Sequence, residues 1–239
     1  MAPTTLLISE LGSQGDGVAA HDGRKVFVPL ALPGETVTAE VNGERAKLID
    51  IVTPSPIRVG QRCSHYGECG GCSLQHMADG AYLELKRQFL VSALSFQRID
   101  VAVDNVIPVP PRSRRRAVFA AARAGKNMVV GFHGRRSHQI VPMRDCAVVT
   151  PGLLALLPKL EKLAVVAAPP KDAVAVTVTE TTTGFDVALA GVARGFPADA
   201  RVKLAQLAGE LFGREVGPRR VEDPHVVGVQ DRLVAALQG

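Results

Sequence analysis

The sequence lacks a long uninterrupted apolar run and a secretory leader. Its most apolar stretch, residues 153–168, is broken by Pro158, Lys159, Glu161 and Lys162, whereas a membrane-spanning helix needs about 20 predominantly apolar residues. The start MAPTTLLISELG has no basic segment followed by an apolar core, which is the pattern of a signal peptide. We therefore expect a cytoplasmic protein without a membrane partner, in which cysteine side chains stay reduced.

Cysteine is also scarce, and its few positions are clustered. Three cysteines lie in RCSHYGECGGCSLQH with the spacing C-x5-C-x2-C, and one lies far downstream in VPMRDCAVV; they are Cys63, Cys69, Cys72 and Cys146. Four soft thiolates suit an iron–sulfur cluster or a structural zinc. Gly67, Gly70 and Gly71 are predicted to supply the positive φ angles of a tight ligand turn. Two disulfides or four ordinary buried thiols are the alternative, which the missing export signal disfavours.

Acidic residues are absent between Arg112 and Arg144, a segment that we call the basic stretch. Its basic residues are Arg112, Arg114, Arg115, Arg116, Arg123, Lys126, Arg135, Arg136 and Arg144. Positive charge without carboxylates indicates a polyanionic partner, and guanidinium groups bind phosphate bidentately or stack on unpaired bases. The residues predicted to contact RNA are Arg112, Arg114, Arg115, Arg116, Arg135 and Arg136. A solvated basic surface is the alternative, and Phe119 and Phe132 are expected in the core more often than under a base.

Residues 1–58 are predicted to form an OB-like all-β barrel. Five short segments rich in β-branched or apolar residues alternate with turn signals at 12–17, 22–23, 33–34 and 42–43. Barrels of this kind commonly bind oligonucleotides, which agrees with the charge of the basic stretch.

Residues 59–212 are predicted to form an α+β central domain, an antiparallel sheet with helices on one side. Strands are expected at 114–123, 127–133, 173–182 and 184–191, and helices at 76–97, 151–164 and 197–213. Thr150 and Pro151 mark a helix start, as N-cap and first helical residue. Residues 213–239 form a divergent tail to which we assign no domain.

Three phrases of the chain resemble the iron–sulfur branch of the TrmA/RumA type of RNA (uracil-5-)-methyltransferases. They are GDGVAAHDGRKVFVPLALPGETV, PSPIRVGQRCSHYGECGGCSLQH and GFHGRRSHQIVPMRDCAVV, similar to the TRAM barrel, the cluster loop and the segment with the last cluster ligand. The likeness extends from residue 5 to about residue 210. It implies that Cys63, Cys69, Cys72 and Cys146 hold a [4Fe–4S] cluster, with zinc as the alternative, and that the cluster supports folding or RNA recognition.

The same resemblance implies a Rossmann-like methyltransferase domain, for which we expect no counterpart in this chain. Family members bind S-adenosylmethionine at a glycine loop, add a cysteine to uracil C6, and remove the C5 proton with a carboxylate. After Cys146 the sequence has neither a D-x-x-x-G-x-G-like loop nor an N-P-P-R-type segment. With all four thiols assigned to the metal, no nucleophile is left. We therefore expect an apparently truncated member with no catalytic residues and no S-adenosylmethionine site.

Two functions follow from these observations. The first is the RNA-binding, cluster-bearing portion of an S-adenosylmethionine-dependent RNA (uracil-5-)-methyltransferase, not catalytic by itself, with ribosomal RNA favoured over transfer RNA by analogy. The second is a stand-alone RNA-binding module with a structural zinc held by the four cysteines. The oligomeric state is not predicted by any feature of the sequence.

Overall fold

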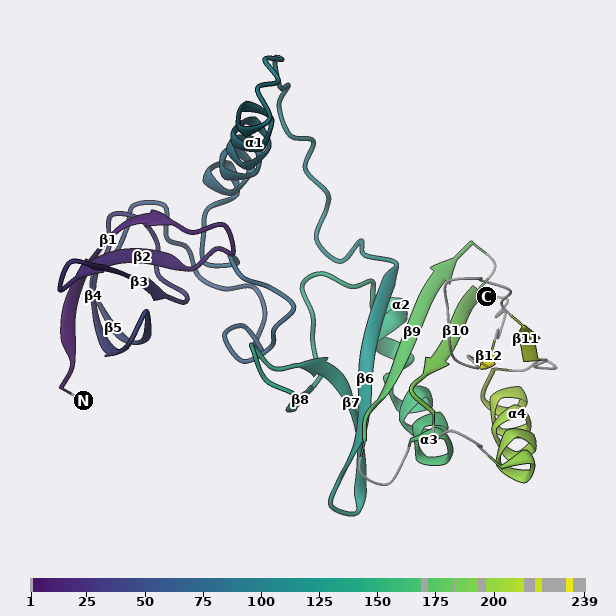
Figure 1. The fold of residues 1–239 in the computed structure, drawn as a ribbon. Helices are drawn as coiled ribbons and strands as arrows, with labels where there is room; N and C mark the ends of the chain where they lie inside the picture. Colours follow the sequence, from purple (N-terminus) through teal and green to yellow (C-terminus); the bar gives the residue numbers. More distant parts are fainter. Residues whose placement is uncertain are drawn as a thin grey trace. The chain divides into compact units, whose positions relative to one another are not determined.

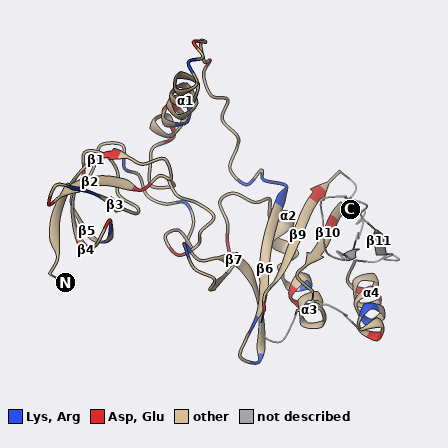
Figure 2. Cartoon of the chain, in the orientation of Figure 1, with Lys and Arg blue, Asp and Glu red and all other residues tan. Residues whose placement is uncertain are grey.

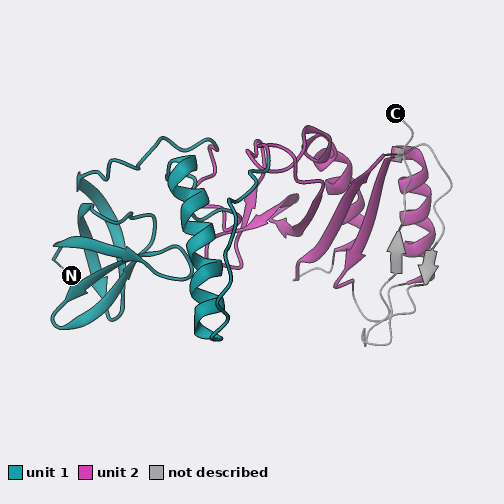
Figure 3. Ribbon diagram, turned by 90° about the horizontal axis from the view of Figure 1, so that it is seen from above, with its two compact units in different colours: residues 1–62, 72–109 teal, residues 63–71, 110–239 magenta. Residues whose placement is uncertain are grey.

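The computed structural model describes residues 2–168, 172–182, 184–192, 197–212, 218–220 and 231–233. The chain forms two compact units (Figure 3): the first is Met1–Arg62 with Cys72–Val109, and the second is Cys63–Gly71 with Pro110–Gly239. The predicted domain boundaries after residues 58 and 212 stay a prediction, and each unit is described by itself below.

The first unit contains a closed five-stranded barrel, as predicted (Figure 1). Its strands are β1 (Thr4–Leu11), β2 (Gly17–His21), β3 (Arg24–Val28), β4 (Thr36–Asn42) and β5 (Arg45–Thr53), in the order β1-β2-β3-β5-β4. Neighbouring strands are antiparallel except the pair β3 and β5. Leu6, Ile8, Val26 and Val37 lie in the barrel core, where each such side chain contributes about 1.5–3 kcal/mol.

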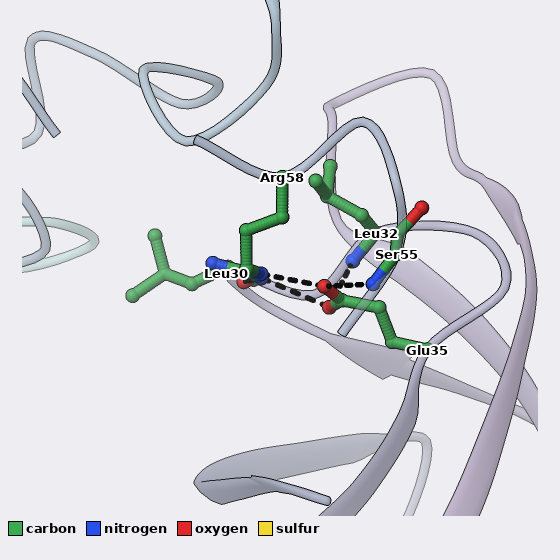
Figure 4. Close-up of polar contacts among 5 residues, drawn as sticks. All are labelled: Leu30, Leu32, Glu35, Ser55 and Arg58. Carbon is green, nitrogen blue, oxygen red and sulfur yellow. Dashed lines mark hydrogen bonds and ion pairs between the residues drawn. The ribbon is translucent and has the colours of Figure 1, made fainter. Parts of the chain in front are cut away.

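A buried ion pair fixes the turn before β4 to the link after β5 (Figure 4). The Glu35 carboxylate is fully buried and accepts hydrogen bonds from the Leu32 amide (2.8 Å), the Ser55 amide (3.2 Å) and Arg58 Nη2 (2.9 Å). Arg58 Nη2 also donates to the Leu30 carbonyl (2.7 Å). Burial acts to raise the pKa of Glu35, but the Arg58 guanidinium and the two amides outweigh burial, so the pKa is lowered. Glu35 is therefore held ionised.

The link after the barrel pairs with the segment before the first helix. The Ala78 amide donates to the Ile57 carbonyl and the Val59 amide to the His76 carbonyl, both at 2.8 Å, and an antiparallel bridge joins Arg58 to Met77. These bonds close the base of a loop, residues 60–75, which we call the cysteine loop.

Helix α1 (Asp79–Phe96) follows, close to the predicted range of 76–97. None of its residues is buried, and Leu90 and Phe96 are exposed. The helix is thus confirmed, but within the described residues its apolar side chains add nothing to a buried core.

The second unit contains the predicted antiparallel sheet with helices (Figure 1). Its strands are β6 (Arg116–Ala124), β7 (Asn127–His133), β8 (Ile140–Pro142), β9 (Val174–Thr181) and β10 (Gly184–Ala190), in the order β10-β9-β6-β7-β8, and all neighbours are antiparallel. Helix α3 (Leu157–Ala167) packs on β6, β7 and β9, and α4 (Ala198–Phe212) packs on α3. A short pair, β11 (Pro218–Arg220) and β12 (Asp231–Leu233), lies in the predicted tail.

The helix expected at 151–164 is two helices, α2 (Pro151–Ala155) and α3. Pro158 has no amide with which to bond the carbonyl of Leu154, so the series of backbone hydrogen bonds is interrupted between the two helices. The predicted start is confirmed, because the Thr150 side chain accepts a hydrogen bond from the Leu153 amide at 3.3 Å. No described helix is long and apolar enough to span a membrane.

Replacing Arg58 with Met should destabilise the first unit by about 3 kcal/mol, because it leaves the buried Glu35 carboxylate without its cation. Urea unfolding followed by circular dichroism measures this loss. Arg62→Met is the matched control: Arg62 pairs with Asp79 on the surface, where an ion pair contributes less than about 1 kcal/mol. Equal losses in the two variants would contradict the structural role of the buried pair.

The lowered pKa of Glu35 also predicts a dependence on pH. A carboxyl whose pKa is depressed by folding stabilises the protein above its unfolded pKa, about 4.3 for glutamate. That stabilisation is lost as the pH falls from there through the folded pKa. The free energy of unfolding should fall more steeply with acid in the wild type than in Glu35→Gln, as urea titrations at a series of acidic pH values will measure; identical slopes would refute this prediction.

Candidate metal centre and nucleic-acid interface

The cysteines are free thiols, and no disulfide joins them. Cys63, Cys69 and Cys146 are buried, and Cys72 is half-buried. The disulfide alternative therefore does not describe this structure, and the choice lies between ordinary thiols and metal ligands.

Two of the thiols, distant in sequence, belong to the same buried cluster in the second unit. Cys69 and Cys146 both belong to the buried cluster that also contains residues of the sheet and of α3. The Gly71 amide points at Cys69 Sγ (3.3 Å) and the Val148 amide at Cys146 Sγ (3.4 Å). Such N–H···S bonds stabilise a thiolate and tune the sulfur ligands of iron–sulfur clusters. Both sulfur atoms thus accept a hydrogen bond of the kind that metal-bound thiolates accept.

Among the described residues, no three His, Cys, Asp or Glu side chains are arranged to hold a metal ion. The type of donor and the local amides fit a thiolate-bound group, whereas its assembly from Cys63, Cys69, Cys72 and Cys146 stays a prediction.

Two of the three glycines of the cysteine loop do not have the positive φ angle that we predicted. Gly67 has the predicted positive φ, 95°, but Gly70 and Gly71 do not, so the prediction was wrong for these two. Gly70 is required for a close approach instead: a Cβ there would lie 3.0 Å from the His133 carbonyl oxygen and 3.2 Å from that of Gly134. Sequence spacing gave no indication of this distant neighbour.

The cysteine loop pairs through its backbone with the turn between β7 and β8, residues 133–139, which we call the arginine turn. The Gly70 amide donates to the His133 carbonyl (2.9 Å), the Arg135 amide donates to the Glu68 carbonyl (2.8 Å), and Cys69 forms an antiparallel bridge with Gly134. One predicted metal ligand, Cys69, is therefore in direct backbone contact with the turn that carries Arg135 and Arg136, within the second unit.

The basic stretch divides into parts with different surroundings (Figure 2). Arg114, Arg115 and Arg116 are exposed at the start of β6. Glu180 of β9 is next to them, since its amide donates to the Arg115 carbonyl at 2.7 Å. The stretch is thus free of acid in sequence but has an acidic neighbour in the fold.

The other arginines vary in their availability to a partner. Arg112 Nη2 pairs with Asp145 at 3.2 Å, and Arg123 Nη2 donates to the Val165 carbonyl at 2.9 Å. Arg135 is half-buried, and Arg136 is exposed with a φ of 53°. Arg136 is thus in the same exposure class as Arg114–Arg116.

The aromatic residues of the basic stretch belong to the core, as expected. Phe119 is fully buried, and its ring centroid lies 5.0 Å from that of Phe132. Phe119 cannot stack on a base in this structure.

Comparison with known proteins agrees with this architecture. Residues 4–45 match the TRAM domain. The chain is 42% identical over 212 residues to an uncharacterized RNA methyltransferase of Caulobacter vibrioides, covering 86% of this chain and 51% of the relative. It is 38% identical over 166 residues to the 23S rRNA (uracil(1939)-C(5))-methyltransferase RlmD of Marinomonas, covering 66% and 38%.

A similar match, 36% over 209 residues, is found with an uncharacterized RNA methyltransferase of Brucella suis, covering 87% of this chain and 50% of the relative. The chain spans about half the length of these two uncharacterized relatives. With its TRAM barrel and these relatives, the chain belongs to the RNA (uracil-5-)-methyltransferase family.

Proposed function

We propose that this chain is the RNA-binding portion of an S-adenosylmethionine-dependent RNA (uracil-5-)-methyltransferase, with ribosomal RNA as its substrate class. The observation that carries the proposal is a TRAM barrel joined to a second unit with exposed arginines, in a chain similar to RlmD over 66% of its length. Arg114, Arg115 and Arg116 would neutralise phosphates, while the barrel supplies a second RNA-binding surface.

In this proposal Cys63, Cys69, Cys72 and Cys146 hold a [4Fe–4S] cluster, which supplies a structural cross-link between the cysteine loop and the segment before α2. The amides of Gly71 and Val148 support two of the sulfur atoms. Four protein ligands leave no iron open to substrate. A structural zinc on the same thiols, in a stand-alone RNA-binding module, is the second candidate.

The proposed activity of this chain is RNA binding and not methyl transfer. The reaction needs a thiolate to add to uracil C6, and every thiol of the sequence is a proposed metal ligand. A nucleophile from outside these 239 residues would have to reach a uridine turned out of its stack.

The metal assignment predicts about four iron and four sulfide per chain, with absorbance near roughly 400 nm, in protein purified without oxygen. Cys72→Ser should lose the metal and lower the melting temperature, because four thiolates are needed to complete the site. Ser64→Ala, beside Cys63, is the control and should keep both. One zinc without sulfide would support the second candidate, and unchanged metal in Cys72→Ser would remove Cys72 from the ligands.

The RNA surface predicts a change in salt dependence. Replacing Arg114, Arg115 and Arg116 together with Gln should weaken binding to an RNA stem-loop. The log–log slope of affinity against salt should become shallower by about 0.7–0.9 for each phosphate that is no longer neutralised, as fluorescence anisotropy at several salt concentrations will measure. The control removes three exposed charges from the helices: Lys162, Arg201 and Lys203 to Gln. Equal slopes in the two triple variants would mean that the start of β6 does not bind RNA.

A further inference from the structure

The arginine turn is stabilised partly by hydrogen bonds within it and partly by backbone hydrogen bonds with the cysteine loop. Its own bonds include those from the Gly134 amide to the Gln139 carbonyl (2.7 Å), from the Ser137 amide to the Gly134 carbonyl (3.1 Å) and from the Gln139 amide to Ser137 Oγ (3.0 Å). The cysteine loop adds the two bonds at His133 and Arg135 described above. The backbone on either side of Gly134 is thus fixed by residues far away in the sequence.

We infer that Gly70 is a positioning residue for RNA recognition: it lets the cysteine loop hold the arginine turn in the arrangement that presents Arg135 and Arg136 to phosphate. This inference rests on the proposed RNA binding and extends it to a residue that does not itself contact RNA. Gly70 acts only through the turn.

The close approach at Gly70 makes a larger residue unfavourable at this position. A Cβ would lie 3.0 Å and 3.2 Å from two carbonyl oxygens of the arginine turn, so each oxygen would have to shift by a few tenths of an ångström. A branched side chain at Gly70 would therefore displace the backbone at His133 and Gly134 and weaken the bond between the Gly70 amide and the His133 carbonyl.

The backbone conformation of Arg136 is a second indication that the arginine turn depends on contacts with the cysteine loop. Arg136 has a φ of 53°, in the left-handed region that few residues other than glycine adopt. Contacts around a turn must hold such a residue, and a turn held in advance loses less conformational entropy when it binds. Release of the cysteine loop should therefore lower RNA affinity without removing any charge.

The test is a double-mutant cycle on the full chain, read out as binding of a labelled RNA stem-loop with a uridine in its loop. Gly70→Val should weaken binding about tenfold, as should Arg135→Gln with Arg136→Gln. Because Gly70 acts through these arginines, adding Gly70→Val to the double arginine variant should change little further. Gly60→Val is the control, since a Cβ at Gly60 meets no atom within 4 Å.

Each outcome decides the inference. Full additivity of the glycine and arginine changes, or wild-type affinity in Gly70→Val, would overturn it while leaving the RNA-binding proposal intact. A wild-type chain that does not bind RNA would overturn both. If Gly70→Val does not fold, amide hydrogen exchange of the wild type decides instead: RNA should slow exchange at Gly70 and Arg135 together, and unchanged exchange at both would refute the inference.

Discussion

An ionised carboxylate without access to water is stable in a protein only when donors surround it, and Glu35 imposes this requirement on the first unit. Its donors come from the turn at Leu32, the link at Ser55 and the Arg58 side chain. Glu35 can be buried only when the link that carries Ser55 and Arg58 is positioned to donate these hydrogen bonds. Since residues 57–59 of the link then pair with residues 76–78, the ends of the cysteine loop are fixed by the same requirement.

The buried thiols of the second unit impose a different requirement. A neutral thiol packs as a small apolar group, so Cys69 and Cys146 are compatible with the core in which they lie. A thiolate in the same place would need compensation for its charge, and the amides of Gly71 and Val148 supply part of it. Metal binding, which requires deprotonated thiols, would supply the rest of this compensation, because the cation neutralises the charge on sulfur.

The sequence predicted the turns and helix ends, which depend on neighbouring residues, and missed the close approach that depends on contact between distant segments. Asp22 and Gly23 do have positive φ in a hairpin turn, and Thr150 caps a helix, because both signals act within a few residues. Pro158 is a local signal as well, and by itself it accounts for the division of the predicted helix. The close approach at Gly70 had no local signal, since the carbonyls that it meets lie more than sixty positions along the chain. The predicted metal ligands and RNA contacts depend on such distant pairings, and they stay predictions.

Sheet topology also decides how much of the basic stretch can form one surface. Strands β6 and β7 form a hairpin with Ala120 opposite Gly131, so the start of β6 and the arginine turn lie towards the same end of it. Arg123 and Lys126 lie towards the opposite end, at the hairpin turn (Figure 2). An RNA strand following the open end of the hairpin would meet Arg114–Arg116 and Arg136, but not the basic residues of the closed end. The sequence thus overstates the extent of the basic surface, while the fold concentrates its exposed arginines at the end where the cysteine loop is attached.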